Sequence, residues 1–222
     1  MKKLILSLFV ISALFLSSCE TDSTEDVSEV TVFAELSLLG DPIMFSPVGQ
    51  PFADPGADAS IGGASAPFET VSNVDTSTPG FYNVTYIATN DDGFQASANR
   101  QVIVYEDNGT IAGIYDGIRV GRDDGGLVLI SQISADQFYI SDLLAGWYEF
   151  GPNGYGPAYA WPATINVSGN SVTSPGASAG FGPAAISNGN INNSGPSTVI
   201  TWDILLTDYN FGFPVQFTKI TP

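Results

Sequence analysis

The sequence predicts an all-β protein with two consecutive β domains. From Val30 onward, no window of ten or more residues shows the i, i+3, i+4, i+7 apolar spacing of an amphipathic helix. Short runs of β-branched and aromatic residues recur instead, separated by turn-forming residues that include many of the 24 glycines and 14 prolines. With 44% hydrophobic and 13% charged residues, the chain has enough apolar material to form a core.

The first 18 residues have the pattern of a secretory signal peptide. A positively charged start precedes a nearly unbroken apolar run from Leu4 to Leu16, which is too short to span a bilayer as a mature helix. The run ends in Leu16-Ser17-Ser18-Cys19, which resembles the lipobox of bacterial lipoproteins. This resemblance implies that Cys19 becomes the N-terminus and carries acyl chains such as palmitate, which anchor the protein to a membrane. The alternative is a plain signal peptide followed by an incidental buried cysteine.

Residues 19–29 are expected to form an acidic tether. Glu20 to Asp26 contains no apolar residue that a core could bury. The run resembles the acidic export signal that follows the lipid-bearing cysteine in surface lipoproteins of the Bacteroidota. The resemblance implies an outer-membrane protein that faces the cell exterior, although any solvated linker can be acidic.

The charge balance excludes several classes of function. The chain has 6 basic and 23 acidic residues and a net charge of −17, so we expect no binding to nucleic acid or to anionic membrane surfaces. Loss of the signal peptide removes two lysines and no acid, which brings the mature charge to −19. This surface suits a neutral partner. The chain has no histidine, and so lacks the usual general base and the commonest ligand of catalytic zinc; we expect no cofactor and no metal.

A polar turn at Glu106–Gly109 divides the mature chain into predicted domains at residues 30–106 and 110–222. In the first, Val30–Leu36, Phe81–Ala88 and Arg100–Tyr105 are predicted strands. Three motifs occur in order: Asp54-Pro55-Gly56-Ala57, Asp75-Thr76-Ser77-Thr78-Pro79-Gly80-Phe81-Tyr82-Asn83-Val84-Thr85-Tyr86 and Ala88-Thr89-Asn90-Asp91-Asp92-Gly93. They resemble the bacterial surface-protein Ig-like domain over about residues 36–105. The resemblance implies an Ig-like β-sandwich that acts as a spacer or adhesion module and has no catalytic site.

Three aspartates in these motifs, Asp54, Asp75 and Asp91, are interpreted as turn residues that bind their own backbone. The alternative is that these aspartates are calcium ligands. Their position in predicted turns favours the role in turns.

The second domain is predicted to be a second β-sandwich or a barrel-like domain. The predicted strands are Ile111–Tyr115, Ile118–Val120, Leu127–Ile133, Phe138–Ser141, Trp147–Phe150, Ala163–Val167, Val199–Leu206 and Val215–Ile220. Residues 168–197, rich in Gly, Ser, Asn, Ala and Pro, are predicted to be a long surface loop or several short turns. Gly113–Gly117 and Phe138–Tyr148 resemble the C-terminal domains that follow Ig-like units in lipoproteins of the Bacteroidota. These domains are often associated with glycan-uptake systems, so the resemblance implies an outer-membrane glycan importer as a partner.

An aromatic stretch between residues 147 and 161 is the candidate ligand site. Its rings flank a Gly/Pro/Asn loop, and aromatic faces beside an amide and a carboxylate can bind a neutral oligosaccharide or polysaccharide. The candidate stacking residues are Trp147, Tyr155, Tyr159 and Trp161, and the candidate polar residues are Glu149 and Asn153. The alternative is that these aromatics belong to the core, as we expect for Trp202.

Without histidine or a free cysteine, catalysis would require a pair of carboxylates. The candidates are Asp116, Asp123, Asp124, Asp142, Glu149 and Asp203. Asp123-Asp124-Gly125-Gly126 is predicted to be a hairpin turn, and Glu149 has no visible partner. We therefore expect a surface lipoprotein that binds glycans without catalysis and has an Ig-like spacer. The alternative is a structural or adhesion lipoprotein that binds a protein partner.

Overall fold

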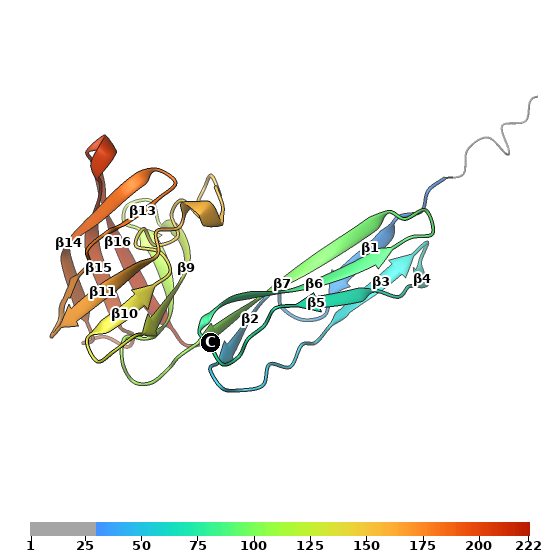
Figure 1. Cartoon of the computed structure of the whole chain (residues 1–222), viewed down its shortest axis with the longest axis horizontal. Coiled ribbons are helices and arrows are strands. Elements are labelled where there is room, and N and C mark those ends of the chain that lie inside the picture. The colour runs from blue at the N-terminus through green and yellow to red at the C-terminus, as the bar shows by residue number, and fades with distance from the viewer. Residues whose placement is uncertain (1–29) are drawn as a thin grey trace, which may run out of the picture.

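The computed structural model describes residues 30–222 and confirms the all-β class (Figure 1). The predicted signal peptide, Cys19 and the acidic tether lie outside the described residues. Within residues 30–222, no helix has the length and hydrophobicity to cross a membrane.

The first part is a sandwich of two sheets. One sheet has the order β1 (Ala34–Leu38), β3 (Ala57–Ile61), β4 (Ala64–Ser65). The other has the order β2 (Ile43–Pro47), β7 (Gln95–Tyr105), β6 (Gly80–Thr89), β5 (Glu69–Ser72), and β2 runs parallel to β7. Alternate residues of the long strands β6 and β7 face inward, as their period-2 pattern requires. The resulting core contains Ala57, Val84, Tyr86, Val102 and Val104.

The second part is a closed eight-stranded antiparallel barrel. Its strands are β8 (Gly113–Arg119), β9 (Asp124–Gln132), β10 (Gln137–Ile140), β11 (Ala163–Ser168), β12 (Ser171–Thr173), β14 (Gly182–Asn192), β15 (Val199–Leu206) and β16 (Phe211–Ile220). Consecutive strands pair, β16 pairs with β8, and β12 pairs with β14 to close the ring. A short strand, β13 (Ala177–Ala179), pairs with the start of β14. Inward side chains such as Ile130, Ile165 and Phe217 fill the interior, so the barrel is a packed core.

Two local predictions for this part were wrong. The predicted loop at 168–197 contains β12, β13 and β14, because its few apolar residues, such as Val172 and Ile191, face the interior while small polar residues face outward. The predicted strand Trp147–Phe150 is instead a series of turns, stabilised by the hydrogen bond from the Phe150 N–H to the Gly146 carbonyl at 2.9 Å.

The segment between β10 and β11 folds into one end of the barrel. Leu143 and Leu144 are fully buried there, and the Leu143 carbonyl accepts a 2.9 Å hydrogen bond from Nε1 of Trp202. The segment approaches the wall where strands β8 and β9 carry glycines. A Cβ on Gly117 would lie 2.8 Å from the Ala145 carbonyl oxygen, so only glycine permits this approach.

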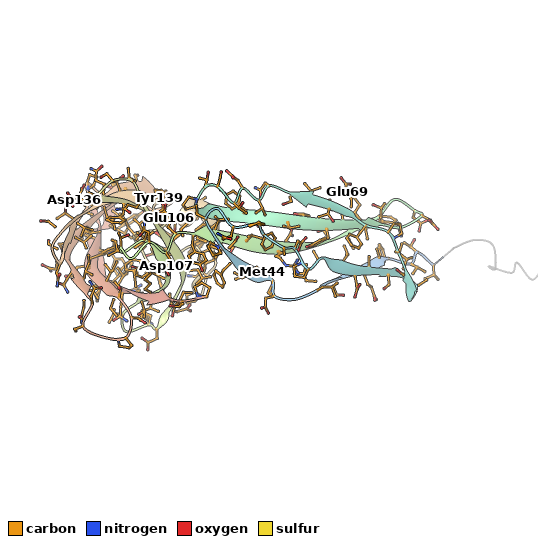
Figure 2. The ribbon with its side chains drawn as sticks, turned by 90° about the horizontal axis from the view of Figure 1, so that it is seen from below. Met44, Glu69, Glu106, Asp107, Asp136 and Tyr139 are labelled. Atoms are coloured by element: carbon orange, nitrogen blue, oxygen red, sulfur yellow. The ribbon has the colours of Figure 1, made fainter. Side chains whose placement is uncertain are left out.

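The two parts meet end to end at the linker, where Glu106 and Asp107 are labelled (Figure 2). A separate apolar cluster joins them: buried Ile103 of β7 packs with buried Ile114 and Leu129 of the barrel. The Glu106 carboxylate accepts a hydrogen bond from the Gln132 N–H at 2.8 Å, and Lys219 pairs with Asp107 at 3.2 Å. The junction is therefore a packed interface.

Candidate functional site

The aromatic loops gather at one end of the barrel. Because neighbouring strands alternate in direction, the ends of β8, β10 and β15 and the starts of β9, β11, β14 and β16 meet there. We call this the loop end; it carries residues 120–123, 141–162, 174–181 and 207–210. The opposite end, where the C-terminus lies, meets the Ig-like domain (Figure 1).

The rings at the loop end form a continuous cluster. Tyr148 lies 4.9 Å from Phe181 between ring centroids, and Tyr159 lies 5.0 Å from both Phe181 and Tyr155. Tyr159 comes close to the backbone at Gly180, where a Cβ would lie 2.2 Å from its ring. These distances are typical of attractive aromatic pairs, so the rings hold one another in place.

An open groove lies on this cluster, and we call it the aromatic groove. Its volume is about 270 Å³, and its lining residues are Tyr148, Phe181, Leu206, Tyr209 and Phe211. Tyr209 belongs to the 3₁₀ turn η3 (Thr207–Tyr209), and its side chain is 64% exposed, while that of Phe211 is 41% exposed. The groove therefore presents ring faces to solvent, as a site for a sugar ring requires.

Arg119, the last residue of β8, lies among the rings beside the aromatic groove. Its Cζ is 4.3 Å from the ring centroid of Phe213, 4.9 Å from Trp147 and 5.3 Å from Phe211. Desolvation lowers the pKa of Arg119, the tyrosine Tyr148 opposes this effect, and Arg122 adds to it. Cation–π contact stabilises the half-buried guanidinium.

The predicted stacking residues lie in the cluster, but their exposure differs. Tyr155 is 46% exposed, while Trp147 and Tyr159 are half-buried, and the Arg119 guanidinium lies over the Trp147 ring. Trp161 is fully buried, and its Nε1 donates to the Gly182 carbonyl at 2.8 Å. Trp161 thus has no free face, and its predicted role as a stacking platform does not fit the structure. Trp202 is buried in the core, as predicted.

The predicted polar residues do not line the aromatic groove. Asn153 is exposed in the turn that precedes η2 (Pro157–Tyr159). Glu149 is half-buried and lies near Tyr139, a residue of the outer wall. Burial, and then the negative charge of Asp142, raise the pKa of Glu149 to about 7.

Asp142 holds the loop that carries these rings. Its side chain is 1% exposed and accepts hydrogen bonds from the N–H groups of Leu144 (2.9 Å), Gly146 (2.8 Å) and Trp161 (2.9 Å). Burial raises the pKa of Asp142 to about 6, although the three N–H groups oppose this shift. Because Asp142 is enclosed, it cannot touch a substrate and serve as the second carboxylate beside Glu149.

The remaining acids have structural surroundings. A hairpin turn joins β8 and β9, as predicted, but it is formed by residues 120–123 and includes only Asp123, with a left-handed backbone (φ 51°), from the predicted set. Asp124, Gly125 and Gly126 lie in β9 and pair with β8. Asp75 accepts hydrogen bonds from the N–H and Oγ of Ser77, as expected of a turn residue. Asp91 lies in a turn, as predicted, but the hydrogen bond to the backbone of this turn is made by the adjacent Asn90, which accepts the Phe94 N–H at 2.7 Å.

Asp54 has a larger role than predicted. It accepts the Gly56 N–H at 3.2 Å, as a turn residue would, but it also pairs with the buried Arg100 and accepts the Tyr86 hydroxyl proton at 2.6 Å. Among residues 30–222, no group of three or more Asp, Glu, His or Cys side chains is placed to hold a metal ion.

Several residues of the aromatic groove were missing from the sequence prediction. Phe181 and the three residues Leu206, Tyr209 and Phe211 come from two other segments of the chain, and only the barrel closure brings them to Tyr148. The Asn210-Phe211-Gly212-Phe213 turn, with its two aromatics, was the available sequence signal.

Comparisons with known proteins agree with this architecture. Residues 36–104 match the model of the bacterial surface protein Ig-like domain, and residues 106–219, over half of the chain, match the model of a C-terminal domain family. No curated protein matches the chain. The chain is similar to the crystal structure of the lipoprotein BT2262 from Bacteroides thetaiotaomicron, with a TM-score of 0.65 and 28% identity over 84% of this chain and 100% of that chain. The resemblance to a surface lipoprotein with an Ig-like domain and a C-terminal β domain is thereby confirmed, and the chain belongs to the family of BT2262-like lipoproteins.

Proposed function

We propose that this lipoprotein is a non-catalytic glycan-binding protein of the outer membrane, and that its ligand lies in the aromatic groove. The observation that carries the proposal is the exposed set of rings at the loop end. Tyr209 and Phe211 offer solvent-facing rings, while Tyr148 and Phe181 form an ordered apolar floor. An oligosaccharide can stack the C–H face of a sugar ring on such a surface, because the rings are already held by their neighbours.

The position of the groove supports this role. The described chain begins at the far end of the Ig-like domain from the barrel (Figure 1). A lipid on Cys19 would therefore attach at that far end. The Ig-like domain would act as a spacer that holds the loop end away from the membrane, where an outer-membrane glycan importer could receive the ligand.

The acids near the loop end support binding without hydrolysis. Glycosidases use two carboxylates that both reach the substrate. Asp142 is enclosed by backbone N–H groups, and Glu149 does not line the groove. Sugar binding through ring faces needs neither residue.

The test is affinity electrophoresis and calorimetry of the lipid-free chain, residues 20–222, against a panel of neutral and acidic polysaccharides. Tyr209→Ala should weaken binding of the retained polysaccharide by about 3- to 10-fold, because one stacking face is lost. A matched control is Tyr139→Ala, which removes a 40% exposed tyrosine from β10, outside the groove. Absence of binding to every polysaccharide, or equal losses in the two variants, would contradict the proposal.

A further inference from the structure

The basic residues of this acidic protein differ in whether they pair with an acidic side chain. Residues 30–222 contain four: Arg100, Arg119, Arg122 and Lys219. Arg100 pairs with Asp54 inside the Ig-like domain, and Lys219 pairs with Asp107 at the junction. The other two lie at the loop end, one at the end of β8 and one in the turn that follows it.

Arg119 has no acidic partner in the described part of the chain. No carboxylate lies within 4.0 Å of its guanidinium, and its side chain makes no hydrogen bond there. Every buried side-chain nitrogen within residues 30–222 has a hydrogen-bond partner. The guanidinium nitrogens of Arg119 have none, so they are not fully buried. The N–H groups therefore reach solvent, while aromatic rings cover the guanidinium carbon at 4.3 to 5.3 Å.

Arg119 also borders the aromatic groove. The Phe211 ring that lies 5.3 Å from its Cζ lines the groove, and so does the Trp147 neighbour Tyr148. A ligand stacked in the groove would bring its substituents to the edge of the guanidinium.

We infer that the groove accepts a saccharide bearing a carboxylate, a uronate, whose carboxylate pairs with the guanidinium of Arg119. This inference rests on the proposed function and names its ligand class. The planar guanidinium, held by Phe213, Trp147 and Phe211, presents a preorganised fork to which a carboxylate binds through two parallel hydrogen bonds. Pairing would also compensate the partial desolvation of a cation that has no counter-ion of its own.

The net charge of −19 expected for the mature chain led to the expectation of a neutral ligand. Binding of a carboxylate at Arg119, however, depends on the charges within a few ångströms of its guanidinium. At physiological salt the Debye length is about 8 Å, so distant acids are screened. The charged group that acts on Arg119 is a second cation, Arg122. Burial raises the pKa of Tyr148, so this tyrosine is neutral at physiological pH. In β9, Asp124 is the residue opposite Arg119, and its carboxylate accepts the Gly125 N–H at 2.8 Å.

The test uses matched ligands: oligogalacturonate and oligoglucuronate, and the same oligosaccharides after reduction of each carboxyl to a neutral hydroxymethyl group. Calorimetry of residues 20–222 should show about 10- to 100-fold tighter binding of at least one acidic form, as a charge-assisted hydrogen bond provides. Arg119→Gln should remove this preference, so that the ratio between the affinities for the acidic and the neutral form falls to about one. Arg122→Gln, the matched control, should retain most of the preference.

Arg119→Lys separates charge from geometry, because lysine keeps the charge but lacks the fork; it should retain only part of the preference. Near-ultraviolet circular dichroism of each variant shows whether the aromatic cluster is intact. Equal or tighter binding of the neutral forms, or a preference that survives in Arg119→Gln, would overturn the inference and leave glycan binding standing. A preference for sulfated galactan over both uronates would also overturn the carboxylate assignment. If no saccharide binds, the proposed function fails, and the inference fails with it.

Discussion

Arg100 is fully buried in the Ig-like domain and connects segments that lie far apart in the sequence. Its guanidinium donates to the carbonyls of Leu39, Asp41 (3.1 Å) and Gly56 (3.3 Å), to the Tyr86 hydroxyl at 2.7 Å and to the Asp54 carboxylate. The Gly56 carbonyl also accepts the Leu39 N–H at 3.0 Å, so Arg100 is the main donor to the carbonyls of Leu39 and Asp41. The desolvation of Arg100 is compensated only while these partners stay in place.

We expect Arg100→Met to lower the free energy of unfolding of the Ig-like domain by about 3–5 kcal/mol, because it leaves buried acceptors unpaired. Asp54→Asn should cost less, about 1–2 kcal/mol, since the Asp54 side chain is 27% exposed. Urea denaturation checks both values, with Arg122→Met as the control for loss of an exposed arginine. An unchanged unfolding midpoint in Arg100→Met would show that the network adds nothing to stability.

The same network predicts an acid limit. Burial raises the pKa of Asp54, but the hydrogen bonds from Tyr86 and Gly56 and the charge of Arg100 outweigh it and hold the pKa below 3.8. The stabilisation is therefore present above about pH 4 and is lost as the pH falls through the lower pKa of the folded state. Denaturation at pH 3 and pH 6 should show this loss in the native chain and a smaller one in Asp54→Asn.

Glu149 predicts the opposite pH dependence in the barrel. Its pKa rises from 4.5 to about 7, so between these values the folded protein holds a proton that the unfolded chain releases. Stability should fall as the pH rises through this window, by about 1 kcal/mol after allowance for solvent screening. Glu149→Gln should reduce the difference between urea midpoints at pH 4.5 and pH 8, whereas Asp116→Asn, an exposed acid of β8, should leave it unchanged. If the difference between the two urea midpoints persists in Glu149→Gln, the pH dependence of stability would come from Asp142 and not from Glu149.

At the scale of elements, the glycines of β8 and β9 give the loop end its shape. Gly117, Gly125 and Gly126 remove side chains from the wall where the turn at Ala145 and Gly146 packs. The Gly126 N–H donates to the Ala145 carbonyl at 3.1 Å, so the turn is bonded to the strand. This turn directly precedes Trp147 and Tyr148, and it thereby positions one wall of the aromatic groove.

We expect Gly117→Ala to destabilise the barrel by about 1–3 kcal/mol, because the new methyl group would lie 2.8 Å from the Ala145 oxygen and force the turn outward. Tryptophan fluorescence during urea unfolding measures this loss. Gly195→Ala is the matched control, since its methyl group would meet nothing closer than the Ser197 oxygen at 3.8 Å. Equal stability of the two variants would mean that the turn at Ala145 can shift away from β8 without loss of free energy.

The elements differ in how far the sequence could predict them. Strand Val199–Leu206 was predicted with the observed bounds, because its alternating and β-branched residues are a local signal. The pairing of β12 with β14 could not be predicted, since Ser171 opposite Asn190 carries no pairing preference. The burial of Trp161 was missed for a similar reason: it depends on contacts with Phe181 and the Gly182 carbonyl, which lie about twenty residues later in the chain. Local patterns thus predicted most strands, and long-range contacts decided the closure of the barrel and the membership of the groove.

At the scale of the whole molecule, the junction decides whether the Ig-like domain can act as a spacer. Each half contributes apolar residues to one interface, with Phe45 and Phe81 on the sandwich side and Leu127 and Ile220 on the barrel side. The side chain of Asn108 in the linker donates to Gln132 of β9 at 2.8 Å. Because the linker is bonded to the barrel and the apolar interface packs the two halves together, the halves should move as one rod.

This rigidity predicts a narrow distance distribution between the two halves. Since Cys19 is the only cysteine, residues 20–222 with Glu69→Cys and Asp136→Cys accept two spin labels at exposed sites, one in each half (Figure 2). Pulsed electron paramagnetic resonance should give a single narrow peak. Adding Leu129→Asp, which places a charge in the apolar junction, should broaden it, because an unpaired buried charge separates the packed surfaces. Thr70→Asp, an exposed change on β5, should leave the peak unchanged. A broad distribution in the chain without Leu129→Asp would mean that the barrel is held on a hinge, and the groove would then have no fixed direction relative to the membrane.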